Sequence, residues 1–215
     1  MRIRFPWHLL AAVATGLVVA ACGVAPTVER DAKAEHFPYQ GGDVAAAQRG
    51  ADCELALRGT LTPAAVSALR LASDALAKHS CRGKTVVLDL GDGSVGTAIT
   101  VGSMLRNRGF DTRIAAGSTC RTPCLLVFSA GTQREIAPNA RLGFTQIPPD
   151  EDFGRASCET ELDNRQMLNL ARYLRAMLPG LTADYMLQQI RATDCRSVRE
   201  LPASDAVTAG LATRG

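Results

Sequence analysis

Strand-like and helix-like segments alternate through the middle of this 215-residue chain, and that alternation limits the fold more than any other feature. Short runs such as "KTVVLDL" are followed by a turn and a helical pattern, and the pair Thr62 and Pro63 is typical of a helix start. Strands that alternate with helices favour parallel pairing, because each helix returns the chain to the same end of the sheet. The sequence therefore predicts an α/β domain of repeated strand-helix units with a largely parallel sheet and C-terminal helices. The expected strands are 54–62, 84–90, 111–116, 134–138 and 140–146, and the expected helices are 63–78, 95–109, 120–131 with its leading turn, 159–178 and 183–192.

The first residues have the pattern of an export signal. An apolar run from Leu9 to Ala21 follows two arginines, and its length is typical of a signal-peptide core, since a membrane span needs about 20 apolar residues. The stretch "VAAC" resembles the bacterial lipobox, which implies cleavage before Cys22 and diacylglycerol on its sulfur. The alternative is an ordinary signal peptide followed by a chance cysteine. We expect a signal peptide at 1–21 and a lipid-anchored protein on the periplasmic side of a bacterial cell envelope, with Gly23 favouring the outer membrane.

Residues 22–52 are polar, are broken by prolines and glycines, and show little periodicity. Such a composition predicts a flexible, lipid-anchored tether that lets the domain stand away from the membrane. The α/β domain is then expected at 53–215, a length that can bury one substantial core.

Six cysteines remain when Cys22 is set aside, and an even number in an exported chain indicates disulfides. The sequence does not fix their pairing, although adjacency along the chain favours Cys53–Cys81, Cys120–Cys124 and Cys158–Cys195. In "CRTPC" one helical turn separates the two cysteines, a spacing that a disulfide can span. A zinc site would need further ligands, and a thioredoxin-like motif has two intervening residues in place of three. We therefore expect neither a metal nor another cofactor.

The charge and the aromatic content bound the partners. The formal net charge of the chain is +3, and aromatic residues make up 5% of it. Neither value favours nucleic acid, which is bound by basic patches and stacking aromatic side chains. The expected partners are the membrane and a peptide or envelope protein.

Three stretches follow one another in a distinctive order. They are "VVLDLGDGSV", then "GFDTRIAAGSTCRTPCLLVFSAGTQREIAPNARLGFTQ", and near the end "SDAVTAGLAT". On these stretches the chain resembles, from about Leu55 to Thr213, the Clp-protease and crotonase superfamily, in particular its ClpP-like exported bacterial branch. The resemblance implies a Clp/crotonase-like domain, in which a nucleophile turn lies between two cysteines and a hairpin supplies the base.

The resemblance also assigns the positions of the reactive groups. The serine and histidine positions are Thr122 and Thr145, and a threonine side chain cannot act as a base near neutral pH. One oxyanion donor would be the N–H of the residue after the nucleophile, but that residue is Pro123, which has none. The other donor belongs to the glycine-rich turn, where Gly93 is retained but Asp92 replaces the preceding glycine. A carboxylate there would repel a developing oxyanion.

These departures predict a pseudoenzyme without catalytic residues, in which Thr122 serves as a helix N-cap and the flanking cysteines staple the turn. We expect the domain to bind a peptide or protein partner in the groove that the family uses for its substrate. The alternative is an active peptidase that uses Thr122 or Ser118, or a crotonase-like enzyme, with an unrecognised base. The resemblance also allows a homo-oligomer through the late helices, although an apolar helix face that only completes the core has the same pattern.

Overall fold

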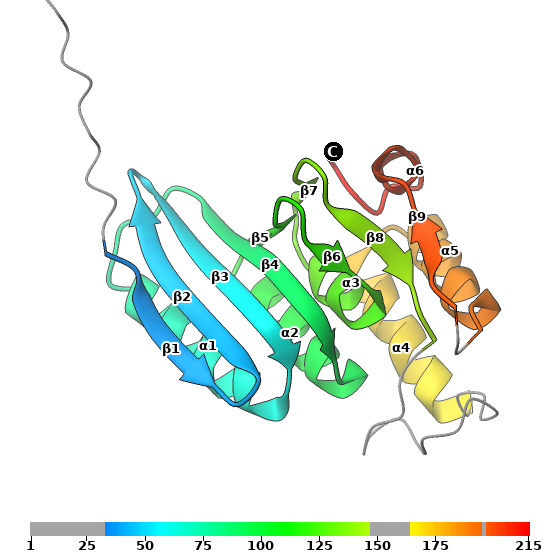
Figure 1. Cartoon of the computed structure of the whole chain (residues 1–215), viewed down its shortest axis with the longest axis horizontal. Helices are drawn as coiled ribbons and strands as arrows, with labels where there is room; N and C mark the ends of the chain where they lie inside the picture. The colour runs from blue at the N-terminus through cyan, green and yellow to red at the C-terminus, as the bar shows by residue number, and fades with distance from the viewer. Residues whose placement is uncertain (1–32, 147–163, 195–196) are drawn as a thin grey trace, which may run out of the picture.

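The computed structural model describes residues 33–146, 164–194 and 197–215, and consists of two β-sheets backed by helices (Figure 1). The larger sheet has the strand order β1-β2-β3-β4-β5-β7, and the smaller sheet has the order β6-β8-β9. The strands are β1 (Glu35–Tyr39), β2 (Gly42–Arg49), β3 (Asp52–Leu61), β4 (Lys84–Gly93), β5 (Asp111–Ile114), β6 (Thr119–Cys120), β7 (Arg134–Ile136), β8 (Arg141–Phe144) and β9 (Arg199–Leu201). The helices are α1 (Pro63–Leu76), α2 (Val95–Asn107), α3 (Thr122–Phe128), α4 (Asn164–Met177), α5 (Gly180–Ala192) and α6 (Ala203–Thr208).

The pairing follows the predicted α/β pattern. Strands β3, β4, β5 and β7 are parallel to one another, whereas β1 and β2 add to β3 in antiparallel fashion. In the smaller sheet, β6 is parallel to β8 and β9 is antiparallel to it. The prediction of a mostly parallel sheet followed by C-terminal helices is confirmed.

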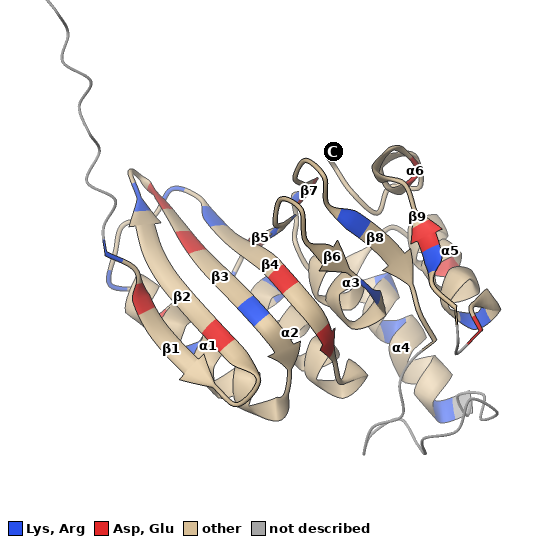
Figure 2. Cartoon of the chain, viewed as in Figure 1, with Lys and Arg blue, Asp and Glu red and all other residues tan. Residues whose placement is uncertain are grey.

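The core lies between the larger sheet and its helices. Alternate residues of β3 and β4, such as Leu55, Leu57, Val86 and Leu88, are fully buried, because side chains of a strand alternate between its two faces. In Figure 1 helices α1 and α2 lie behind this sheet, while the face toward the viewer carries charged residues (Figure 2). Helix α3 is buried along its whole length. No helix in the described ranges is long and apolar enough to cross a membrane.

The predicted tether at 22–52 is wrong from Glu35 onward. Strands β1 and β2 form a hairpin that extends the larger sheet, so the folded domain begins at β1 and not at Cys53. The hairpin turns at Gly41, whose φ of +106° suits glycine. Val44 and Ala46 are buried on the core side of β2. The alanines and polar residues of this segment have low strand propensity, and packing against β3 and α1 overrides it.

Two of the favoured disulfides are present. Cys53 at the start of β3 is bonded to Cys81, and Cys120 in β6 is bonded to Cys124 in α3. The remaining proposed pair, Cys158–Cys195, and the lipidation position Cys22 lie outside the described residues.

Candidate functional site

Helix α3 begins at Thr122, directly after the short strand β6. Its N-cap is Arg121, so the prediction that Thr122 is the N-cap is wrong by one residue. Pro123 lies in the first turn, where a missing N–H costs no hydrogen bond within the helix. The Cys120–Cys124 disulfide closes this turn, with 5.1 Å between the two Cα atoms.

Thr122 and Thr145 lie in direct contact. The Thr122 hydroxyl donates to the main-chain carbonyl oxygen of Thr145 at 2.7 Å and accepts the main-chain N–H of Thr145 at 2.8 Å. Thr122 has no exposed surface. Since a peptide carbonyl does not take up a proton near neutral pH, this contact does not activate the hydroxyl for attack. The hydroxyl instead ties the start of α3 to the residue that follows β8.

The end of β4 carries the glycine-rich turn of the inferred site. Gly93 donates its N–H to Oδ1 of Asp92 at 2.8 Å. The position requires glycine, because a Cβ there would lie 2.3 Å from the Cβ of Leu61. Of the two main-chain donors that the resemblance implies, Pro123 has no N–H and Gly93 is bonded to a carboxylate.

The histidines and lysines of the described residues lie on other elements. His36 is on the edge strand β1, where its Nδ1 lies 2.8 Å from Oδ2 of Asp43. Lys78 and His79 follow α1, and Lys84 begins β4 at the opposite end of that strand from Gly93. Within the described ranges, the start of α3 therefore receives its polar contacts from threonine and main-chain groups, not from a histidine or lysine.

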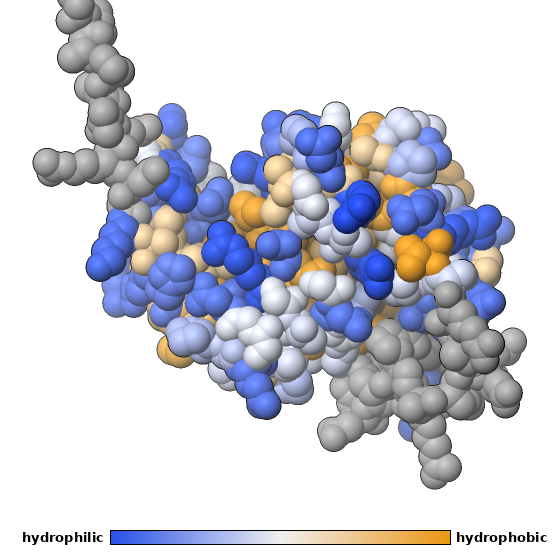
Figure 3. Space-filling view, viewed as in Figure 1, coloured by the Kyte–Doolittle hydropathy of each residue, from blue (hydrophilic) through white to orange (hydrophobic). Residues whose placement is uncertain are grey.

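Strand β4 is longer than β5, its neighbour on one side. β3 pairs with β4 as far as Gly93, whereas β5 pairs only with Thr85 to Leu88. Among the described residues, Asp89, Leu90, Asp92 and Gly93 thus pair with β3 alone and Gly91 lies at a register shift, while β6 lies near β4 without pairing with it. No described atom lies within 4 Å of the point where a Cβ of Gly91 would be, and Figure 3 shows small areas of apolar surface between β4 and the smaller sheet. A strand edge of this kind can accept one further extended segment.

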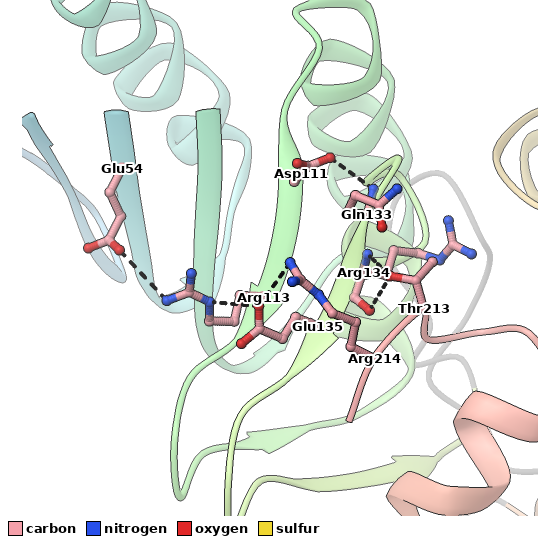
Figure 4. Close-up of polar contacts among 8 residues, drawn as sticks. All are labelled: Glu54, Asp111, Arg113, Gln133, Arg134, Glu135, Thr213 and Arg214. Carbon is pink, nitrogen blue, oxygen red and sulfur yellow. Dashed lines mark hydrogen bonds and ion pairs between the residues drawn. The ribbon is translucent and has the colours of Figure 1, made fainter. Parts of the chain in front are cut away.

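The C-terminal segment is attached to β7 around Arg134 (Figure 4). The buried Arg134 guanidinium donates to the carbonyl oxygens of Leu211 at 2.7 Å and Gly210 at 3.1 Å. The main-chain N–H of Thr213 donates to the Arg134 carbonyl oxygen at 2.8 Å. Burial and the positive charge of Arg106 lower the pKa of Arg134. The sequence alone did not reveal this role of Arg134, which lies in the stretch between α3 and β8.

A chain of alternating charges crosses the exposed face of the larger sheet (Figure 4). Arg113 lies 4.0 Å from Glu54 and 3.6 Å from Glu135, which in turn lies 3.4 Å from Arg214. These groups are partly exposed, so each ion pair contributes little to stability on its own. No cluster of three or more His, Cys, Asp or Glu side chains that could hold a metal ion occurs in the part of the chain that the structure describes.

No family model matches the chain, and no curated protein matches its sequence. Solved structures do match its fold. The 1510-N membrane-bound stomatin-specific protease is 11% identical with a TM-score of 0.57, over 74% of this chain and 76% of that one. The ClpP protease catalytic domain from Plasmodium falciparum is 12% identical with a TM-score of 0.54, over 74% and 82%. A probable enoyl-CoA hydratase from Mycobacterium tuberculosis is 11% identical with a TM-score of 0.55, over 80% and 73%.

A further structure of the stomatin-specific protease is a complex with a substrate peptide, at 12% identity and a TM-score of 0.57. Identities this low indicate a shared fold and nothing more about activity. Together with the parallel sheet and the C-terminal helices, these matches show that the chain has a ClpP/crotonase-like fold.

Proposed function

We propose that this chain is a non-catalytic ClpP-like protein of the bacterial cell envelope, and that it binds an extended segment of a peptide or partner protein. The observation that carries the proposal is the pair of hydrogen bonds between Thr122 and Thr145. A nucleophile must be free to reach its substrate and must pass its proton to a base. The Thr122 hydroxyl is buried and donates a hydrogen bond to a main-chain carbonyl oxygen, which is not a base.

The oxyanion position supports the same proposal. An acyl-transfer enzyme stabilises a negative oxygen with donors that are oriented before the substrate arrives, and losing one donor costs about 3 to 4 kcal/mol of transition-state stabilisation. Here Pro123 has no N–H, and the carboxylate of Asp92 accepts the N–H of Gly93. An oxyanion would have to displace that carboxylate and tolerate its charge.

Peptide binding is favoured by the end of β4, which extends beyond its ladder with β5. An extended peptide placed along Asp89 to Gly93 would use main-chain groups that have no ladder partner on that side among the described residues. The substrate peptide in the similar stomatin-specific protease is a precedent for a peptide on this fold. A site that has lost its chemistry can keep such a binding edge, because binding depends on the strand and not on the reactive groups.

The proposed location follows from the N-terminal sequence. A lipid on Cys22 would hold the domain at a membrane, and the residue after it favours the outer one. Disulfides are consistent with this compartment, since they persist in oxidising surroundings. Metabolic labelling with a radioactive fatty acid tests the assignment. The wild-type chain should take up label, whereas the Cys22→Ser variant should not.

Peptide binding is tested with the full-length chain, purified in detergent, immobilised, and exposed to a random decapeptide library. Gly91→Trp places a large side chain beside the open edge of β4, at a position with free space and no left-handed backbone. Gly180→Trp is the matched control, because Gly180 has equal free space at the start of α5. We expect intact peptides to be recovered from the wild type and the control, and about tenfold less from Gly91→Trp.

Three outcomes would contradict the proposal. Equal recovery from Gly91→Trp would remove β4 as the binding edge, and recovery from no variant would remove peptide binding altogether. Cleaved peptides, or a covalent adduct of a fluorophosphonate probe on Thr122 or Ser118, would show that the protein is an active enzyme.

A further inference from the structure

A small polar pocket of about 220 Å³ lies on the outer face of the smaller sheet, beside the start of α3. Each of the three strands of that sheet contributes to it. Its charged lining residues are Arg121, Arg141 and Glu200. Figure 2 marks a basic residue in β8 and charged residues in β9.

The strand register explains why these side chains meet. Thr119 is paired with Arg141 in the parallel ladder, so both point to the same face. Arg121 follows Thr119 by two residues and keeps an extended backbone, which directs it to that face as well. In the antiparallel ladder of β8 and β9, Glu200 is paired with Gly143, which has no side chain.

The floor of the pocket depends on Gly143. A Cβ at this position would lie 2.7 Å from Cγ1 of Val198 and 3.3 Å from the carbonyl oxygen of Arg199. The close approach of the segment before β9 thus excludes a larger residue. Val198 therefore packs over Gly143 and forms part of the pocket lining.

Some arginines of the described residues are paired with acidic side chains. Arg108 lies 3.0 Å from Asp74, and Arg175 lies 2.8 Å from Asp184. Arg121 and Arg141 make no ion pair or side-chain hydrogen bond within the described ranges, and neither does Glu200. Two guanidinium groups thus face one carboxylate, and the pocket carries an excess of one positive charge.

We infer that this pocket binds a carboxylate group of the bound peptide, and the inference rests on the proposed peptide-binding function. Arginine presents paired N–H donors that match the two oxygens of a carboxylate. Because Arg121 directly precedes Thr122, the pocket adjoins the former nucleophile position. The carboxylate belongs either to an acidic side chain or to the C-terminus of the peptide, and Glu200 weakens its binding through like-charge repulsion.

The experiment uses four versions of the random decapeptide library on the immobilised full-length chain. Two versions contain Asp and Glu and two contain Asn and Gln in their place, and each pair is made with a free C-terminal carboxylate or a carboxamide. We expect about tenfold enrichment of the version that carries the recognised carboxylate over the neutral carboxamide version. The enriched version identifies the source, since two pairs of versions differ in the terminus alone and two pairs differ in the side chains alone.

Variants separate recognition from damage to the fold. The double variant Arg121→Gln with Arg141→Gln should reduce the enrichment to parity, whereas Arg70→Gln, an exposed substitution on α1, should leave it unchanged. Glu200→Gln should increase the enrichment, because it removes the repulsion. A damaged fold would not produce that gain.

The outcomes also separate this inference from the proposed function. Equal binding of all four versions that is still abolished by Gly91→Trp overturns the carboxylate pocket and keeps the peptide edge. Enrichment that survives the double arginine variant overturns the pocket as well. Absence of binding in all four versions overturns both.

Discussion

The Thr122 hydroxyl and the main chain of Thr145 form a reciprocal pair, in which one oxygen both donates to the carbonyl and accepts from the N–H of the same residue. The arrangement satisfies the N–H and the carbonyl of Thr145, which lies just beyond the last residue pair of the β8–β9 ladder. It also consumes the hydroxyl of the residue in the nucleophile position. Under the proposed function, this hydroxyl is a structural group and not a nucleophile.

Thr122→Val should destabilise the domain, because valine keeps the shape of threonine but leaves the partly buried N–H and carbonyl of Thr145 without this partner. Each unsatisfied group costs about 1 to 3 kcal/mol, so we expect a loss of about 2 to 4 kcal/mol in the free energy of unfolding. Thr122→Ser keeps the hydroxyl and should lose only about 1 kcal/mol for the missing methyl group. Urea denaturation followed by circular dichroism measures both.

The matched control is Thr100→Val on α2, where the hydroxyl donates to a helix carbonyl at the surface. Its cost should stay within about 0.5 kcal/mol. If Thr122→Val costs no more than this control, the Thr122–Thr145 pair does not stabilise the fold.

The two observed disulfides should differ in their contribution. Cys53 and Cys81 are 28 residues apart, and Cys120 and Cys124 are 4 residues apart. In the chain-entropy account the longer loop contributes about 3 to 4 kcal/mol and the shorter about 2 kcal/mol. Replacing each pair by alanines and comparing urea midpoints measures the difference. A larger loss from the Cys120–Cys124 pair would mean that this bridge acts on the folded state, by holding the start of α3.

Much of the fold could be predicted because its strands are buried and its helices have clear ends. "KTVVLDL" is apolar and β-branched, and it became the longer part of β4. The α4 pattern was less decisive. Leu168 is apolar but 47% exposed, while Leu170 and Tyr173 are buried. Tyr173 is buried because its hydroxyl donates to the carbonyl oxygen of Leu126 in α3, a partner that helical periodicity does not reveal.

The hairpin of β1 and β2 could not be predicted from propensity. Its alanines adopt the strand conformation because they pair and pack with residues that are distant in sequence. The Gly41-Gly42 pair was interpreted as interrupting regular structure, whereas it forms the turn of the hairpin. At the candidate site, the contact of Thr122 with Thr145 agrees with the alignment by motifs. The bond from Gly93 to Asp92 could not be foreseen, because sequence does not give the direction of a carboxylate.

Alkaline pH should destabilise the β1–β2 hairpin through Tyr39. Burial, and secondarily the charge of Asp43, raise the pKa of Tyr39 to about 12 from its usual value of 10.0. Since the folded pKa lies above the unfolded one, the stabilisation is complete below pH 10 and is lost as the pH rises toward 12. Tyr39→Phe should flatten this part of the pH dependence, although it also removes the hydrogen bond to the carbonyl oxygen of Arg58.

Urea midpoints of the wild type and Tyr39→Phe between pH 8 and about pH 12 test the assignment. Burial also raises the pKa of Tyr173, which remains in the variant, so the slope should decrease and not vanish. Parallel curves for the two proteins would contradict a role for Tyr39.

Arg134 should hold the C-terminal segment in place. Its guanidinium donates to carbonyl oxygens of both Gly131 and Leu211, and lysine cannot reach two separate segments with one ammonium group. Arg134→Lys should therefore destabilise the domain by about 2 to 4 kcal/mol, because buried carbonyls lose a charged donor. Arg70→Lys, on the exposed face of α1, should change stability by less than about 0.5 kcal/mol.

Hydrogen exchange locates the effect of Arg134→Lys. The amides of Thr213 and Arg214 donate to the Arg134 carbonyl oxygen at 2.8 and 3.2 Å, and they should exchange faster in the variant. Amides of β3 and β4 should exchange through global unfolding in both proteins. Their exchange rates should therefore rise only as much as the loss of global stability requires. If the amides of Thr213 and Arg214 change no more than those of β3 and β4, Arg134 supports the core as a whole and does not act as a clamp on the C-terminal segment.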